Sequence, residues 1–195
     1  PTIALSSSSA SLKAGETATI TFTLSESASD FVVGDITVSG GTVGSFAGSG
    51  TSYTVVFTPD ASSTANGVIS VANTKFTDAA GNTNADGSDA NNMATITVDT
   101  AVPTVSNVTS STADGSYKVG DAIAITVVFS EVVNVTGTPQ ITLEAGSSDA
   151  VVNYTSGSGS NTLTFNYTVA SGHSSADLDY VATSSLALNS GTIND

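Results

Sequence analysis

Residues 17–24 read Thr-Ala-Thr-Ile-Thr-Phe-Thr-Leu, and every second side chain in this stretch is apolar. The same alternation recurs at residues 53–57, 93–98 and 163–169. Alternation with a period of two is typical of a strand that buries one face, and no part of the chain carries the apolar stripe of an amphipathic helix. The sequence therefore predicts an all-β protein.

The two halves of the chain repeat each other. Lys13 and Glu26 recur as Lys118 and Glu131, so both pairs are 105 residues apart (118 − 13 and 131 − 26). Four further identities between these positions share the same spacing. Chance rarely produces so many matches in register, so the sequence indicates a tandem duplication.

The repeat predicts where the domains begin and end. Residues 98–103, Val-Asp-Thr-Ala-Val-Pro, join the last strand of the first copy to the first strand of the second, and Pro103 keeps this joint short and stiff. We expect one domain at residues 1–100 and another at 101–195. Seven short strands in about 100 residues fit an antiparallel sandwich, so the expected fold is two tandem β-sandwiches with Greek-key connections.

The two ends of the sequence raise a separate expectation. Pro1 is not a natural start, so we expect the chain to be a piece of a longer protein. The second copy stops at residues 191–195, before the counterpart of the last strand of the first copy, and we expect its sandwich to be incomplete at the C-terminal end. The open edge reflects either a boundary of the fragment or a place for a strand donated by a neighbouring molecule.

Composition excludes several functions. The chain has 17 Asp and Glu but only 3 Lys and Arg, for a net charge of −14, so it repels nucleic acids and anionic lipids. No apolar run is long enough to span a membrane, and the absence of cysteine excludes disulfides and thiolate metal sites. The single histidine, His173, lies in a serine-rich loop, and no nucleophile or phosphate-binding motif is present. We therefore predict that the protein is not an enzyme.

Several motifs resemble a known family. Residues 13–26, 35–41 and 76–82 resemble a bacterial Ig-like domain, and residues 117–121 and 137–143 resemble a sister type. The resemblance implies a non-catalytic repeat of a large calcium-dependent surface adhesin, similar to the extender repeats of RTX-type adhesins. It also implies an extracellular location, at the bacterial cell surface or secreted, and a role in cell adhesion and biofilms. The implied partners are neighbouring Ig-like repeats of the same long chain.

Acidic residues of the first copy are expected at one end of its sandwich. The loop after the second strand and the loop before the seventh meet there, and they carry six carboxylates and a side-chain amide, those of Glu26, Asp30, Asp35, Asp78, Asp86, Asp89 and Asn82. Carboxylates at close range repel each other unless water or a cation separates them. Carboxylate and amide oxygens are ligands that Ca²⁺ prefers, so we predict a calcium site here. The alternative is that these residues are solvated and keep the chain soluble.

The duplication predicts a second calcium site at the joint. Glu131 is the counterpart of Glu26, and Asp195 is the expected counterpart of Asp78. Both should lie at the end of the second domain where the linker arrives with Asp99. The resemblance to adhesin repeats also implies calcium between domains. We therefore predict that Asp99, Glu131 and Asp195 hold an ion that stiffens the tandem repeat.

Three functions remain open at this point. The first is a structural extender that projects a distant binding domain from the cell. The second is an adhesion module that recognises a glycan or a partner protein, for which Tyr154 and Tyr180 are candidate contact residues. The third is a filament or sheath subunit that is completed by a strand from the next chain.

Overall fold

The computed structural model describes residues 1–195, which divide into two compact units, Pro1–Ala101 and Val102–Asp195. Strands dominate both units, and the only helices are two three-residue 3₁₀ turns, η1 (Val33–Asp35) and η2 (Ala90–Asn92). The predicted all-β fold class is confirmed. The helical segments are far too short and polar for a membrane crossing.

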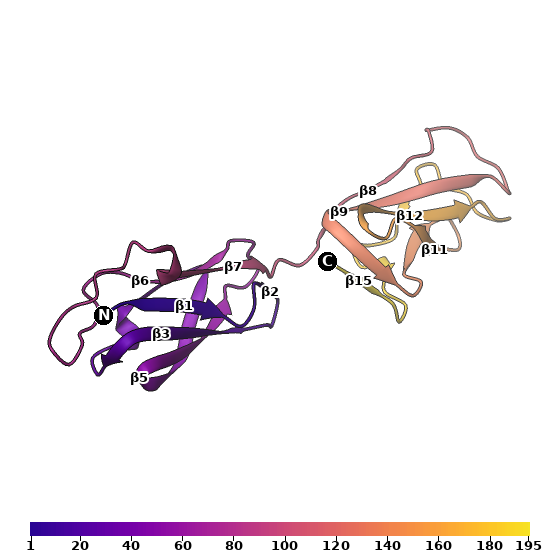
Figure 1. Ribbon diagram of the computed structural model, residues 1–195. Coiled ribbons are helices and arrows are strands. Elements are labelled where there is room, and N and C mark those ends of the chain that lie inside the picture. Colours follow the sequence, from indigo (N-terminus) through magenta and orange to yellow (C-terminus); the bar gives the residue numbers. More distant parts are fainter. The chain divides into compact units, whose positions relative to one another are not determined.

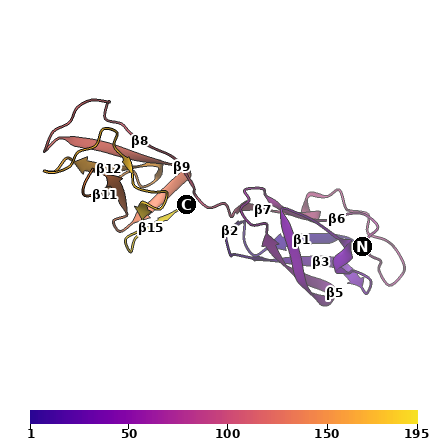
Figure 2. The ribbon, with the colours of Figure 1, turned by 180° about the vertical axis from the view of Figure 1, so that it is seen from behind.

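The first unit is a sandwich of two sheets (Figure 1). The three-stranded sheet has the order β1 (Ile3–Ser7), β3 (Ala18–Ala28), β5 (Gly41–Pro59). The four-stranded sheet has the order β2 (Ser11–Lys13), β7 (Met93–Asp99), β6 (Gly67–Val71), β4 (Ile36–Ser39). All neighbours are antiparallel except β2 and β7, which run parallel, and β6 and β7 can be followed side by side from the opposite direction in Figure 2.

Alternating side chains of the two sheets form the core of the first unit. In β3, Ile20, Phe22 and Leu24 are buried, while the intervening threonines are more accessible, as the sequence pattern predicts. Phe31 lies at the centre of an aromatic cluster, and its ring centroid is 5.2 to 5.8 Å from those of four other rings. The hydroxyl of one of these, Tyr53, donates a hydrogen bond of 2.6 Å to the carbonyl of Ala28, which ties the end of β3 to this cluster.

The second unit is built from eight strands that form one continuous set of ladders. The strands are β8 (Val105–Ser110), β9 (Ala122–Thr136), β10 (Gln140–Glu144), β11 (Ala150–Ser156), β12 (Ser160–Thr168), β13 (Asp179–Tyr180), β14 (Leu186–Ala187) and β15 (Thr192–Asn194). The main path is β13-β10-β11-β12-β9-β15, with β8 paired to β9 and β14 to β10. The core contains buried side chains from β9, β10, β11 and β12.

One pair of glycines shows how the two units correspond. Gly48 in β5 and Gly157 between β11 and β12 have φ angles of 121° and 114°. A Cβ atom on Gly48 would lie 2.3 Å from the carbonyl oxygen of Ser52, and one on Gly157 would lie 2.1 Å from that of Thr162. Both positions require glycine because the chain turns back closely on itself. The long strand β5 of the first unit thus corresponds to the hairpin β11–β12 of the second.

The two units differ in the part of the sheet where β7 lies in the first unit. In the first unit β7 lies between β2 and β6, so β6 is an interior strand. In the second unit β13 pairs with β10 on one side only and ends the sheet. Residues 116–118, which correspond in sequence to β2, form no strand. No strand of the second unit therefore takes the place that β7 occupies in the first.

Candidate functional site

Two of the predicted ligands meet inside the second unit. Strand β15 runs antiparallel to β9, with Asn194 opposite Asn134, and this register brings the following residue, Asp195, towards Glu131. Carboxylate oxygens of Glu131 and Asp195 lie within 4.8 Å of each other, and both residues are half-buried. Two half-buried carboxylates at this separation raise each other's electrostatic energy, so the pair favours a nearby cation.

The third predicted ligand, Asp99, is the last residue of β7 in the first unit. It lies opposite Lys13 of β2 in the parallel ladder and is half-buried. The next residue, Thr100, is buried and fixes the strand end, because its hydroxyl donates a 2.6 Å hydrogen bond to the carbonyl of Asp60. The Oδ1 atom of Asp99 is buried and has no hydrogen-bond partner. A buried carboxylate oxygen without a donor is costly, so Asp99 has unused capacity to ligate a cation.

The other predicted ligands of the first unit accept local hydrogen bonds. The Asp30 carboxylate accepts bonds from the amide and the hydroxyl of Thr77, at 3.0 and 2.7 Å, and these bonds hold the pKa of Asp30 below its usual range. The Asp35 carboxylate accepts the amide of Val32 at 2.9 Å and so closes the turn of η1. In these positions the two carboxylates stabilise the loops that contain them.

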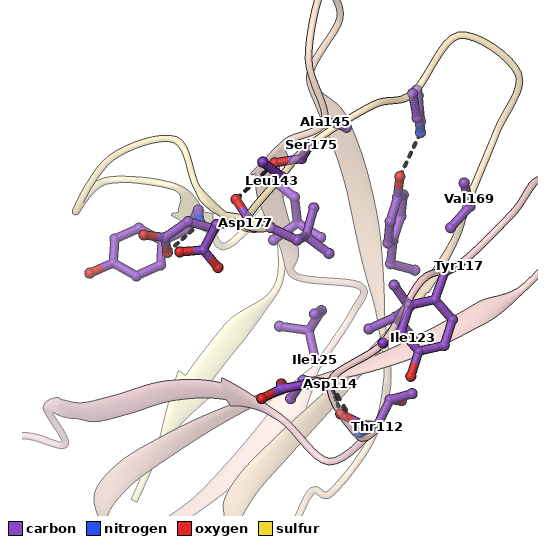
Figure 3. Close-up of a pocket in the computed structure, with 18 of the residues that line it drawn as sticks. Thr112, Asp114, Tyr117, Ile123, Ile125, Leu143, Ala145, Val169, Ser175 and Asp177 are labelled. Atoms are coloured by element: carbon purple, nitrogen blue, oxygen red, sulfur yellow. Dashed lines mark hydrogen bonds between the residues drawn. The ribbon is translucent and has the colours of Figure 1, made fainter.

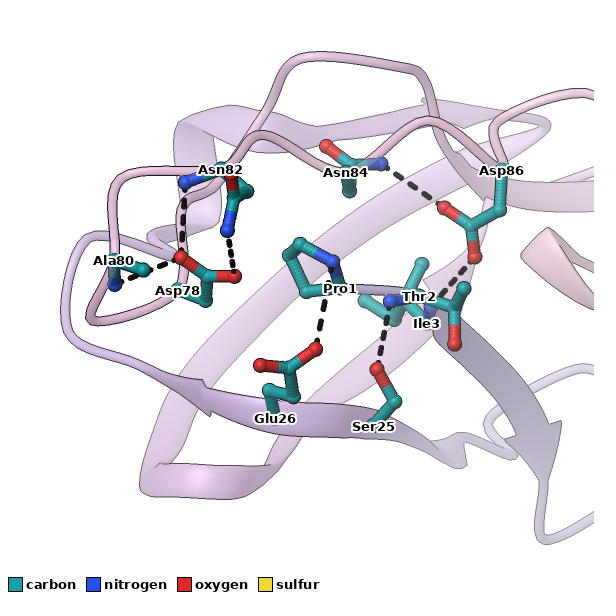
Figure 4. A network of polar contacts seen from close by, with 10 residues as sticks. All are labelled: Pro1, Thr2, Ile3, Ser25, Glu26, Asp78, Ala80, Asn82, Asn84 and Asp86. Carbon is teal, nitrogen blue, oxygen red and sulfur yellow. Dashed lines mark hydrogen bonds and ion pairs between the residues drawn. The ribbon is translucent and has the colours of Figure 1, made fainter.

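Asp78 and Asn82 form a compact turn with each other (Figure 4). The Asp78 carboxylate accepts bonds from the side-chain and backbone N–H groups of Asn82, at 2.8 and 2.9 Å, and from the Ala80 amide. These donors, the Asn82 side chain first, lower the pKa of Asp78. Glu26 projects from β3 on the same side, with its Oε1 atom 3.8 Å from the nitrogen of Pro1. No three carboxylates of the first unit come close enough to one another to form a candidate metal site by themselves. A calcium site at this end of the first unit therefore stays a prediction.

The burial of Asp86 was not predicted, although the sequence placed this residue among the acids at one end of the first unit. Asp86 is 8% exposed, and its Oδ2 atom accepts the amide of Ile3 at 2.7 Å, which pins β1 to the long loop before β7. Its Oδ1 atom accepts a bond from the side-chain amide of Asn84, which is fully buried. Burial raises the pKa of Asp86, but the hydrogen bonds from Ile3 and Asn84 outweigh it and leave the pKa lowered. The sequence carries no signal that separates Asp86 from the exposed acids around it.

An open cleft of about 830 Å³ lies at one end of the second unit (Figure 3). Segments 112–117 and 173–180 form its two sides, and Ile123, Ile125 and Leu143 lie between them. His173 is at the rim, where its Nδ1 atom is 2.8 Å from the hydroxyl of Tyr167 and the two rings stack. Burial raises the pKa of Tyr167.

Comparison with known proteins gives one match, which covers most of the first unit. Residues 1–95 match the family model of the bacterial Ig-like domain. No curated protein and no solved structure gave a match. Bacterial Ig-like domains are generally non-enzymatic and are often extracellular or attached to the cell surface. The match and the two-sheet sandwich together support a bacterial Ig-like domain over residues 1–95.

Proposed function

We propose that this chain is a structural extender module of a large bacterial surface adhesin, in which calcium at the joint stiffens two consecutive Ig-like domains. Asp99, Glu131 and Asp195 are the proposed protein ligands. The match of residues 1–95 to bacterial Ig-like domains supports a structural or adhesion-related surface module. The observation that carries the calcium proposal is the approach of the Glu131 and Asp195 carboxylates to within 4.8 Å.

The donor chemistry fits calcium better than other metals. All three proposed ligands are carboxylates, and the chain contains no cysteine and a single histidine. Hard cations such as Ca²⁺ bind six to eight oxygen atoms, so three carboxylates leave places for backbone carbonyls and water. The buried Asp99 Oδ1 atom without a hydrogen-bond donor is the kind of oxygen that such an ion satisfies.

The linker keeps Asp99 within reach of the second unit. Thr104 pairs with Ser130, because the Thr104 amide donates to the Ser130 hydroxyl at 3.0 Å and the Ser130 amide donates to the Thr104 carbonyl at 2.8 Å. Ser130 is the chain neighbour of Glu131. Thr104 follows Asp99 by five positions, and this stretch spans at most about 18 Å when fully extended. The length of the linker is therefore compatible with one ion that Asp99 and Glu131 share.

Calcium binding has two expected consequences. The folded chain gains stability by mass action, about 2.7 kcal/mol at a concentration 100 times the dissociation constant, because the unfolded chain does not assemble the site. The ion also restrains the linker, since ligands on both sides of it must stay close together. An extender with such joints transmits force and holds its binding domain away from the cell.

Thermal unfolding tests the binding. We expect the midpoint to rise on going from EDTA to millimolar calcium, and calorimetric titration to give a saturable calcium signal that magnesium does not reproduce. Asp99→Asn should remove most of this stabilisation. Asp60→Asn is the matched control, because Asp60 is exposed in the same unit. An unchanged midpoint with and without calcium would contradict the calcium part of the proposal.

Small-angle scattering tests the stiffening separately. Calcium should narrow the distribution of interdomain distances in the unchanged chain. In the Asp99→Asn variant the distribution should stay broad when calcium is added. If calcium binds but the distribution does not change, the ion stabilises a domain without stiffening the joint, and the extender role loses its mechanical basis.

A further inference from the structure

Three buried polar side chains lie close together in the first unit. Asn84 and Asp86 belong to the loop before β7, and Asn92 is the last residue of η2. Asn84 is 0% exposed, Asp86 is 8% exposed and Asn92 is 1% exposed. Water at the protein surface does not reach such groups, so each of them needs hydrogen-bond partners in the interior.

Asn84 and Asp86 have these partners within the protein. The Asn84 Oδ1 atom accepts the amide of Lys75 at 2.7 Å, and its Nδ2 atom donates to the carbonyl of Ala72 at 2.9 Å. Nδ2 also donates to Asp86 Oδ1 at 3.3 Å, while Asp86 Oδ2 accepts the amide of Ile3 at 2.7 Å (Figure 4). A carboxylate oxygen accepts two hydrogen bonds, so Asp86 Oδ1 has room for another donor.

Asn92 differs from the other two. Its backbone amide donates to the carbonyl of Asp89 at 3.0 Å, which fixes the residue at the end of η2. Both polar atoms of its side chain, Oδ1 and Nδ2, are buried and have no hydrogen-bond partner within the protein. The adjacent Asn91 is exposed, so the fold places only one of two neighbouring asparagines in the interior. An unpaired amide is costly there, and an apolar side chain would avoid that cost.

The surroundings of Asn92 favour water as the missing partner. Burial raises the pKa of Asp86, and the Ile3 amide and the side chains of Asn84 and Asn92 together lower it. Asn92 therefore lies near Asp86 but makes no hydrogen bond of ordinary geometry to it, and a bridging water fits such a separation. Water both donates and accepts, as Oδ1 and Nδ2 require. A cation would leave Nδ2 unpaired and would meet N–H groups that already point at the carboxylate.

We propose that Asn84, Asp86 and Asn92 form an internal binding site for one water molecule. The water accepts a hydrogen bond from Asn92 Nδ2 and donates its two hydrogens to Asp86 Oδ1 and Asn92 Oδ1. Through this water η2, which leads directly into β7, is tied to the carboxylate that holds the amide of Ile3 in β1. The site thus joins the first and the last strand of the first unit, and it does not depend on the proposed calcium site.

Nuclear Overhauser contacts between water and the protein test this inference on the whole chain in EDTA. We expect a contact of the sign given by a long-lived internal water at the side-chain amide protons of Asn84 and Asn92. In Asn92→Leu the contact at Asn84 should disappear. Asn91→Leu is the matched control, because it changes the exposed neighbour in the same way, and the contact should persist. If the unchanged chain shows no such contact at either residue, the inference is overturned, even where Asn92→Leu does not fold.

Hydrogen exchange at Ile3 gives a second test, because the two alternatives predict opposite changes. If a water bridges Asn92 to Asp86, Asn92→Leu removes the bridge, and exchange at Ile3 should become about tenfold faster. Asn91→Leu should leave the exchange rate unchanged. If Asn92 is truly unpaired, the apolar side chain removes a cost, and exchange should slow. Slower or equal exchange in Asn92→Leu would contradict the proposed water.

A buffer exchange distinguishes water from a cation. With EDTA present, replacing potassium by sodium should leave the thermal midpoint of the unchanged chain the same. If sodium raises the midpoint of the unchanged chain and of Asn91→Leu, but not that of Asn92→Leu, the site holds a cation and the inference is wrong.

Discussion

The two units of this chain share sequence motifs at a common spacing, but the first has a filled core and the second has an open cleft. In the first unit, β7 inserts Ile96 and Val98 between the sheets, and both side chains are buried. In the second unit the corresponding space is a cleft, and β13 remains at the edge of its sheet. The comparison shows that β7 completes the core of the first unit, since no strand within residues 102–195 fills the corresponding space.

The largest effect is expected from removing the core contribution of β7. Ile96→Ala should destabilise the first unit by about 2–5 kcal/mol, because it removes a fully buried side chain and leaves a cavity. Chemical denaturation resolved by unit measures this loss. Leu163→Ala, at a fully buried position of the second unit, is the counterpart and should lower the other transition. A single transition lowered equally by both variants would show that the units unfold together.

The shared glycine turn offers a matched pair of substitutions. Gly48→Ala and Gly157→Ala each place a Cβ atom within 2.3 Å of a backbone carbonyl oxygen, and each requires an unfavourable positive φ angle. We expect each to cost about 1–3 kcal/mol in its own unit. Gly44→Ala, where a Cβ atom meets nothing within 4 Å, is the control. If only one of the pair is destabilised, the two turns are not equivalent.

The buried Asp86 distinguishes the first unit from its repeat. Asp86→Ala leaves the amide of Ile3 and the side chain of Asn84 without their acceptor, so the first unit should lose about 1–3 kcal/mol. Hydrogen exchange at Ile3 should accelerate while exchange in the second unit stays the same. The exposed neighbour Asp89, replaced by Asn, serves as the control. An unchanged exchange rate at Ile3 would show that another group holds β1.

The smallest effect is expected on acidification. The pKa of Asp30 is lower in the folded chain than in the unfolded chain, because the amide and hydroxyl of Thr77 favour the ionised carboxylate. This contribution to stability is present above the unfolded pKa and is lost as the pH falls below about 4 and through the folded pKa. Asp30 is exposed, so Asp30→Asn should cost less than about 1 kcal/mol at neutral pH and flatten the acid limb. An acid limb of the same slope in Asp30→Asn and the unchanged chain would contradict this role of Thr77.

Sequence patterns predicted the strands well because burial of alternate side chains is a local property. The pattern of residues 17–24 corresponds to the alternating burial of β3, and the glycines that allow the close turns are visible in both copies. The sequence patterns did not predict which strands pair with each other. The second unit has one continuous set of ladders instead of two separate sheets, and this depends on β11 pairing with both β10 and β12.

Some residues of the candidate site could be predicted from the sequence and others could not. Glu131 and Asp195 could be singled out because the duplication relates them to Glu26 and Asp78. Asp86 could not be separated from the exposed acids, because its burial depends on contact with β1, which is more than 80 residues away in the chain. The cleft of the second unit could not be predicted either, because segments that are distant in the sequence become neighbours around it only through folding.

The all-β character, the repeated motifs and the acidity of the chain follow from the amino-acid sequence alone, because side-chain alternation, repetition and charge need no knowledge of contacts between strands. The folded chain was needed to show that Asp86 is buried and how the strands of the second unit pair. Those properties depend on contacts between residues far apart in the chain, and no local pattern records them.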